Sequence, residues 1–212
     1  MEDALLKLQR LLDEESSKRK KELETAKQLA FFAREDETLY LCRSWIVFLF
    51  AHCEQFLKQA TFHYLSIVNE FKVEHDLNAA WHILYGEEKI IKSSPENYVP
   101  PNKLTKSLIF SDFLKPDLKG KLFTSFSFNL KTLRFFFDLV LKSSIQHADW
   151  TLFCSSITYK RNRIAHGEEA FITGIEECEF LHTKTFNFMD ALKDDLIKRM
   201  SCNIEIYSTP QS

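Results

Sequence analysis

The segment 159–167 holds the residue types in this chain that are best suited to chemistry on a phosphate ester. Arg161 is followed directly by Asn162, and His166 comes five positions after Arg161. A guanidinium can hold a phosphate through two parallel hydrogen bonds and stays charged at any relevant pH, whereas imidazole titrates near neutrality. Arg161 and His166 together can therefore bind a phosphodiester and move a proton.

These side chains need a helix end to position them. Asp149 is a suitable helix N-cap, and Gly167 is the residue type that best tolerates the left-handed conformation that follows a helix. The sequence therefore predicts a helix from Trp150 to His166. Five residues of an α-helix turn by about 500°, so Arg161 and His166 project about 140° apart along a rise of about 7.5 Å. The two side chains are expected to flank a shared groove instead of stacking on each other.

Composition predicts helices for the remainder of the chain as well. The 212 residues include only 4 Gly and 5 Pro beside 20 Phe, and sheet proteins of this size need more turn residues for their hairpins. We predict an all-α fold, with a single domain over residues 1–212 as the default at this length. The expected parts are N-terminal helices in 1–73 (2–34, then 36 or 38 through about 68), an irregular insert over 74–122, C-terminal helices in 123–202 (127–141, 150–166 and about 173–200) and a loose tail over 203–212.

Charge and cysteine usage argue against a DNA-packaging protein, a disulfide-bonded protein and a membrane protein. Lys and Arg number 28 against 30 Asp and Glu, a formal net charge of -2, so any site for a polyanion must be local. The 5 Cys are dispersed and never form a CxxC pair, which indicates core thiols in a reducing compartment. The apolar run 39–57 is interrupted by Arg43, His52 and Glu54, groups that are costly in lipid. Acidic residues also follow Met1, so we expect a cytoplasmic protein without membrane contact.

The sequence predicts neither a metal site nor a cofactor. Glu179 and His182 form one Glu-x-x-His step, but a di-iron bundle needs two such steps and two further carboxylates. The 4 Gly are scattered along the chain, so no glycine-rich loop is available to hold the phosphates of a nucleotide.

The segment 161–166 resembles the motif of the HEPN superfamily, whose ribonucleases carry an Arg, four to six intervening residues and then a His. Asn162 stands where those enzymes commonly have a polar residue. Segment 51–58 is similar to the Glu-bearing helix of the group labelled RiboL-PSP-HEPN or MAE-type HEPN. The resemblance covers roughly 39–71 and 127–200, and it implies a bundle of four to five core helices with an insert between the second and the third.

The resemblance also implies a function. It implies a metal-independent endoribonuclease, generally a toxin or an anti-phage defence effector restrained by an antitoxin or another regulatory partner. Such enzymes use the RNA 2′-hydroxyl as the nucleophile and leave a cyclic phosphate and a 5′-hydroxyl. The alternative is a non-catalytic HEPN module that dimerises and binds RNA or another protein. The presence of Arg161, Asn162 and His166 favours the nuclease.

Catalysis by this motif favours a homodimer. Cleavage needs one group to take the 2′ proton and another to protonate the leaving oxygen, whereas one motif supplies a single His. A two-fold interface presents the same surface twice, so two copies of the motif can line one cleft. In that arrangement Arg161 neutralises the phosphorane, His166 transfers protons, and Asn162 orients the His or the phosphate.

Three further residues are secondary candidates for the site. Glu54 is a candidate to position Arg161, and Lys58 and Arg163 are candidates to contact the RNA backbone. The alternative for Glu54 and Lys58 is an ordinary surface ion pair four residues apart on a helix. The alternative for the motif itself is a solvated helix end, where cationic side chains favour the negative end of the helix dipole.

Overall fold

The computed structural model of the chain describes residues 2–71, 127–134, 137, 147–168 and 174–208. Within these ranges the secondary structure is helical and contains no strand, so the prediction of an all-α fold is confirmed. The predicted insert over 74–122 lies outside the described residues. The helices are α1 (Glu2–Phe31), α2 (Glu35–Glu70), α7 (Leu130–Arg134), α8 (His147–Ala165) and α9 (Ile175–Ser208).

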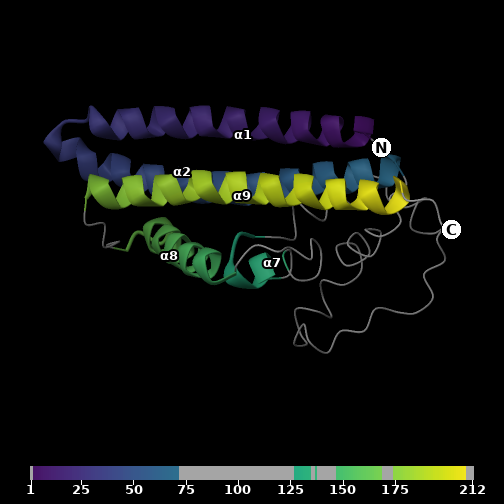
Figure 1. Cartoon of the computed structure of the whole chain (residues 1–212). Helices are drawn as coiled ribbons and strands as arrows, with labels where there is room; N and C mark the ends of the chain where they lie inside the picture. Colours follow the sequence, from purple (N-terminus) through teal and green to yellow (C-terminus); the bar gives the residue numbers. More distant parts are fainter. Residues whose placement is uncertain (1, 72–126, 135–136, 138–146, 169–173, 209–212) are drawn as a thin grey trace.

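Three long helices form the body of the bundle. Figure 1 shows α1, α2 and α9 side by side, with α8 and α7 on the side of α2 and α9 that faces away from α1. α1 runs antiparallel to α2 and α9, whereas α2 and α9 run in the same direction (Figure 1). α8 packs on α2 and α9, and α7 packs on α8. The helix that carries the motif therefore lies on the outside of the body.

Ion pairs set the register between α1 and α9. Lys27 lies 2.9 Å from Glu179, Lys20 lies 2.6 Å from Asp190, and Lys193 lies 3.0 Å from Asp13. All three pairs are partly exposed, so each contributes only about 0 to 1 kcal/mol. Their main effect is to select one antiparallel alignment, while burial of the leucines of α1 provides the stability.

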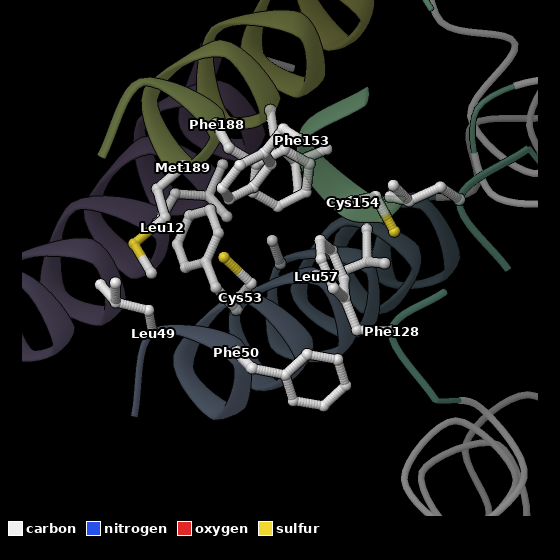
Figure 2. Close-up of a cluster of buried hydrophobic side chains, with 14 of the residues drawn as sticks. Leu12, Leu49, Phe50, Cys53, Leu57, Phe128, Phe153, Cys154, Phe188 and Met189 are labelled. Atoms are coloured by element: carbon white, nitrogen blue, oxygen red, sulfur yellow. The ribbon is translucent and has the colours of Figure 1, made fainter. Parts of the chain in front are cut away.

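The core that supports α8 is rich in aromatic rings. The ring of Phe128 packs edge-on against Phe50, Phe188 and Phe153, with centroids 5.8, 5.5 and 6.4 Å apart. Such edge-to-face pairs add about 0.5 to 1.5 kcal/mol each beyond the burial of their surface. Figure 2 shows this cluster, which joins Leu12 of α1, Leu49, Phe50, Cys53 and Leu57 of α2, Phe128 of the segment 127–129 before α7, Phe153 and Cys154 of α8, and Phe188 and Met189 of α9. The abundance of Phe thus serves to pack α8 onto α2 and α9.

The helix boundaries differ from the sequence predictions in two places. α8 begins at His147, so Asp149 lies in its first turn and is not its N-cap; Asp is favoured at both positions, and its type alone does not separate them. α9 continues to Ser208, so the predicted loose tail is wrong for residues 203–208, and 209–212 lie outside the described residues. Arg199 of α9 lies over the ring of Tyr64 of α2, so the two helices are still in contact near residue 200, the predicted end of the last helix.

An asparagine caps the start of α7. Oδ1 of Asn129 accepts a hydrogen bond of 2.9 Å from the backbone N–H of Thr132. This bond satisfies one of the N–H groups that a helix start leaves without an intrahelical partner. Thr173, where the sequence predicts that the last helix begins, lies outside the described residues.

A buried histidine joins the three long helices and predicts how stability depends on pH. The indole N–H of Trp45 donates to Nδ1 of His182 (3.3 Å), so the ring proton is on Nε2, 3.0 Å from Glu24. Burial lowers the pKa of His182 from its ordinary value, although Glu24 opposes this effect. The unfolded chain therefore binds the extra proton more readily than the folded protein, so stability is fully present above about pH 6.5 and falls as the pH drops through the folded-state pKa.

We expect His182→Gln to lose less stability than the wild type between pH 7.5 and pH 5.5, because glutamine keeps a donor and an acceptor and does not titrate. Urea unfolding at both pH values measures the difference. Burial also lowers the pKa of His52, so part of the pH dependence should remain in the variant. Equal losses in the two proteins would show that His182 does not contribute.

No helix in the described ranges is both long enough and apolar enough to cross a membrane. The apolar run 39–57 lies within α2, where Trp45, Leu49 and Phe56 are buried against the rest of the bundle.

Candidate active site

His166 lies at the C-cap of α8, in a motif that the local sequence explains. The backbone N–H of Glu168 donates to the carbonyl of Arg163 (3.0 Å), and that of Gly167 donates to Ile164 (3.1 Å). Gly167 has a φ of 70°, the left-handed conformation that the Schellman motif requires after a helix. The predicted end of this helix is thereby confirmed, and the turn presents the exposed His166 side chain to solvent.

We expect Gly167→Ala to lower the free energy of unfolding by about 1 kcal/mol, because an L residue is strained in the left-handed region. No heavy atom lies within 4 Å of the position that the new Cβ would take, so the cost comes from the backbone alone. Gly167→Asn, which tolerates this conformation better, should lose less. Urea denaturation of both variants measures the effect, and an alanine variant as stable as the wild type would contradict the strain.

Arg161 projects from α8 toward α2. Its guanidinium carbon lies 4.8 Å from the centroid of the Phe50 ring, and its Nη1 donates to Oδ1 of Asn162 (2.9 Å). Asn162 therefore orients the Arg, where the sequence predicted that it orients the His or the phosphate. Among the described residues, no carboxylate pairs with Arg161, so its charge remains available for an anion.

Arg163 differs from Arg161 because its charge is already compensated. Its Nη1 donates to the hydroxyl of Tyr159 (2.7 Å), and its Nε lies 3.1 Å from Glu168. The guanidinium thus joins the last turn of α8 to the residue that follows the cap. This placement makes Arg163 a weaker candidate for an RNA contact than the sequence suggested.

The hydrogen bonds of Glu54 in the described structure are to residues other than Arg161. Its Oε1 accepts from Lys58 (2.7 Å), and its Oε2 accepts from the backbone N–H of Phe128 (3.0 Å). Phe128 packs on Phe50, the ring beneath Arg161. The residues Phe128 and Phe50 therefore lie between Glu54 and Arg161.

Lys58 lies in the interior of the protein. Its side chain is buried and pairs with the partly exposed Glu54, so Lys58 belongs neither to an ordinary surface ion pair nor, in this structure, to a contact for the RNA backbone. On this face of α2, the backbone N–H of Phe128, in the described segment 127–129 before α7, donates to Glu54. A buried pair costs desolvation that good geometry must offset, and the hydrogen bond to Phe128 supplies part of that offset.

The two central residues lie on different sides of α8, as the predicted angle of about 140° requires. Arg161 lies against α2, and Ile164, one turn later, is half-buried. His166 instead continues an exposed row with Leu152 and Tyr159, at seven-residue spacing. A single chain therefore presents the guanidinium and the imidazole to separate surfaces.

Other chemically capable side chains have structural partners. Glu179 pairs with Lys27 and His182 with Glu24, and within the described ranges no group of three His, Cys, Asp or Glu side chains is arranged to hold a metal ion. Burial raises the pKa of the Cys154 thiol to about 11 and also raises the pKa of Cys53 and Cys178. These thiols are protonated near neutral pH and are poor nucleophiles.

Comparison with protein families identifies the chain. Residues 8–203 match the family described as HEPN_MAE_28990-like HEPN. The chain belongs to this HEPN family. No significant match was found among curated proteins or among solved structures. The family agrees with the resemblance of segments 51–58 and 161–166, and HEPN domains are often ribonucleases.

Sequence reasoning missed the aromatic support of the HEPN motif. Phe50 lies under Arg161, and Phe128 supports Phe50, yet nothing distinguishes either from the other phenylalanines of the chain. The sequence offered one signal, Glu54, which lies one turn after Phe50. A carboxylate so close to core residues needs a hydrogen-bond donor. That partner is a backbone N–H, which has no signature in the sequence.

Proposed function

We propose that this HEPN protein is a metal-independent endoribonuclease of the toxin or anti-phage defence type. The observation that carries the proposal is the guanidinium of Arg161, held by Asn162 and by the Phe50 ring without a carboxylate partner among the described residues. An exposed His166 follows at the end of the same helix. A fixed cation and a titratable imidazole are the two groups that metal-free cleavage of RNA needs.

The proposed site belongs to a homodimer. Leu152 and Tyr159 are 74% and 58% exposed, and they share one side of α8 with His166 because seven residues make almost two complete turns. Apolar side chains exposed in a row are suited to a two-fold contact, which brings both copies of the motif to one cleft. This arrangement overcomes the separation of Arg161 and His166 within one chain.

The proposed reaction uses the RNA itself as the nucleophile. One His166 takes the proton of the 2′-hydroxyl, the 2′ oxygen attacks phosphorus, and the bond from phosphorus to the 5′ oxygen breaks. His166 of the partner subunit gives a proton to the leaving 5′ oxygen, so the products are a 2′,3′-cyclic phosphate and a 5′-hydroxyl. Arg161 stabilises the negative charge that develops on the phosphorane oxygens.

Incubation of the purified protein with a panel of labelled single-stranded RNAs, with and without EDTA, tests this proposal. We expect cleavage that EDTA does not reduce, cyclic phosphate ends on the products, and a dimeric mass by light scattering. A pure dimer that leaves all of these RNAs intact would refute the nuclease. Cleavage that EDTA abolishes would refute the metal-independent mechanism.

The second candidate function is a non-catalytic HEPN module that dimerises and binds RNA or a regulatory protein. The observation that favours it is the placement of Arg161 and His166 on different sides of α8, because one chain alone does not assemble a site. Expression in bacterial cells separates the two functions. A toxin should arrest growth as the wild type and not as His166→Ala, whereas a binding module should give the same growth with both. An antitoxin, if one exists, should relieve the arrest.

A further inference from the structure

A groove lies beside the motif, between α2 and the end of α8. Its volume is about 460 Å³. Five side chains of α2 and one of α8 line it: Tyr40, Arg43, Ser44, Val47, Phe48 and Ile164.

The position of the groove follows from the antiparallel packing of α8 on α2. Arg161 lies over Phe50. One turn further along α8, Ile164 lines the groove together with Val47, which is one turn earlier on α2. The groove therefore begins one helical turn, about 5.4 Å, from the proposed phosphate site and extends away from it along α2. An RNA strand with its phosphate at Arg161 has a neighbouring nucleotide at the groove.

The walls of the groove suit a flat, apolar ring. Tyr40 is 71% exposed and Phe48 is 52% exposed, so both rings present much of their surface to solvent beside the aliphatic Val47 and Ile164. Proteins that bind single-stranded RNA stack unpaired bases on exposed aromatic side chains of this kind. The apolar surface therefore matches one face of a nucleobase.

Arg43 is the charged side chain among the described residues that line the groove. Its buried Nε has no hydrogen-bond partner within the described part of the chain, so no acceptor of that part holds this nitrogen of the guanidinium in place. The hydroxyl of Ser44 already donates to the carbonyl of Tyr40 (3.1 Å), and none of the described residues that line the groove is a carboxylate. Arg43 and Arg161, both beside α2, are thus without compensating acidic partners among the described residues, which complements the charge of RNA.

We propose that this groove binds one unpaired nucleobase of the RNA, next to the phosphate at Arg161, and that Arg43 selects guanine. The base stacks on Tyr40 and Phe48, and the guanidinium of Arg43 donates to the base edge. Guanine presents two acceptors, O6 and N7, to the arginine fork, whereas adenine presents one acceptor and one donor on the same edge. This inference rests on the proposed RNA-binding role of the motif and adds the determinant of sequence preference.

The test measures binding without cleavage, in a chain that carries His166→Ala. Two fluorescein-labelled uridine decamers, with a single guanosine or a single adenosine at the centre, are titrated by anisotropy. We expect the guanosine decamer to bind about tenfold more tightly. Adding Arg43→Met should remove this preference, and adding Tyr40→Ala should weaken both complexes about tenfold. Arg43→Lys keeps the charge but not the fork, so it should lose the preference and retain most of the affinity.

The matched control is Arg10→Met, which removes the same charge from an exposed position on α1 and should leave both affinities unchanged. Equal binding of both decamers by the parent chain, or an unchanged preference in Arg43→Met, would overturn the proposal. So would a dimer that becomes a monomer on Tyr40→Ala or Arg43→Met, because the groove would then be a protein interface. Wild-type protein that shows this binding pattern but does not cut RNA would refute the nuclease alone, whereas cleavage without the pattern would refute the guanine site alone.

Discussion

Replacing His166 by alanine is expected to lower the rate of RNA cleavage by about 10² to 10⁴, the usual contribution of a positioned general acid or base. In the proposed dimer the substitution removes both the base that takes the 2′ proton and the acid that protonates the leaving oxygen. The side chain is exposed and makes no side-chain hydrogen bond in the described structure. The free energy of unfolding should therefore change little.

Single-turnover cleavage of one labelled RNA by wild type and His166→Ala measures this effect, with thermal melting as the test of the fold. His63→Ala is the matched control, because it deletes the same group at a position in α2 about 20 Å along the helix from Phe50. The wild-type rate should have a bell-shaped dependence on pH if one His acts as the acid and the other as the base. His166→Ala that cuts as fast as the wild type would show that this imidazole is not catalytic.

Replacing Arg161 by alanine is expected to lower the rate by about 10² to 10³, as is usual when a group that stabilises transition-state charge is lost. The variant also loses the contact between the guanidinium and the Phe50 ring, which is worth about 0.5 to 1 kcal/mol at an exposed site. The loss of activity should therefore be much larger than the loss of stability. Arg161→Lys keeps the charge but loses the planar fork, so its rate should fall between those of the wild type and the alanine variant.

Arg163→Ala is the informative comparison for Arg161, because it removes an identical side chain two positions away. Glu168 and Tyr159 already bind the Arg163 guanidinium, so this variant should lose less than tenfold in rate. Similar losses in Arg161→Ala and Arg163→Ala would mean that the total positive charge of the helix end matters and that the Arg161 geometry does not.

The helices that were easiest to predict have strong local signals at their ends. Gly167 ends α8 where its left-handed conformation allows the turn, and Asn129 caps α7. The errors lie where the local signal is ambiguous or absent. Asp149 suits both the N-cap and the first turn of a helix, and α9 continues to Ser208, beyond the end that the sequence predicts.

The chain alone determined the chemistry that is available: an Arg, an Asn and a His at a helix end, with the angle between Arg161 and His166 set by the geometry of the helix. These properties are local, because they depend on residues within two turns of one another. Only the tertiary structure decided which side chains surround the motif. Phe50 lies under Arg161, Glu54 binds the backbone of Phe128, and Lys58 is buried. Each of these contacts joins, or depends on, segments far apart in the chain. Many phenylalanines fit the same hydrophobic pattern, and the pattern does not tell which carboxylate finds a partner in another segment. The packing of α8 and of the segment before α7 on α2 selects among them, because buried polar groups must find partners and aromatic rings must fill the space between the helices.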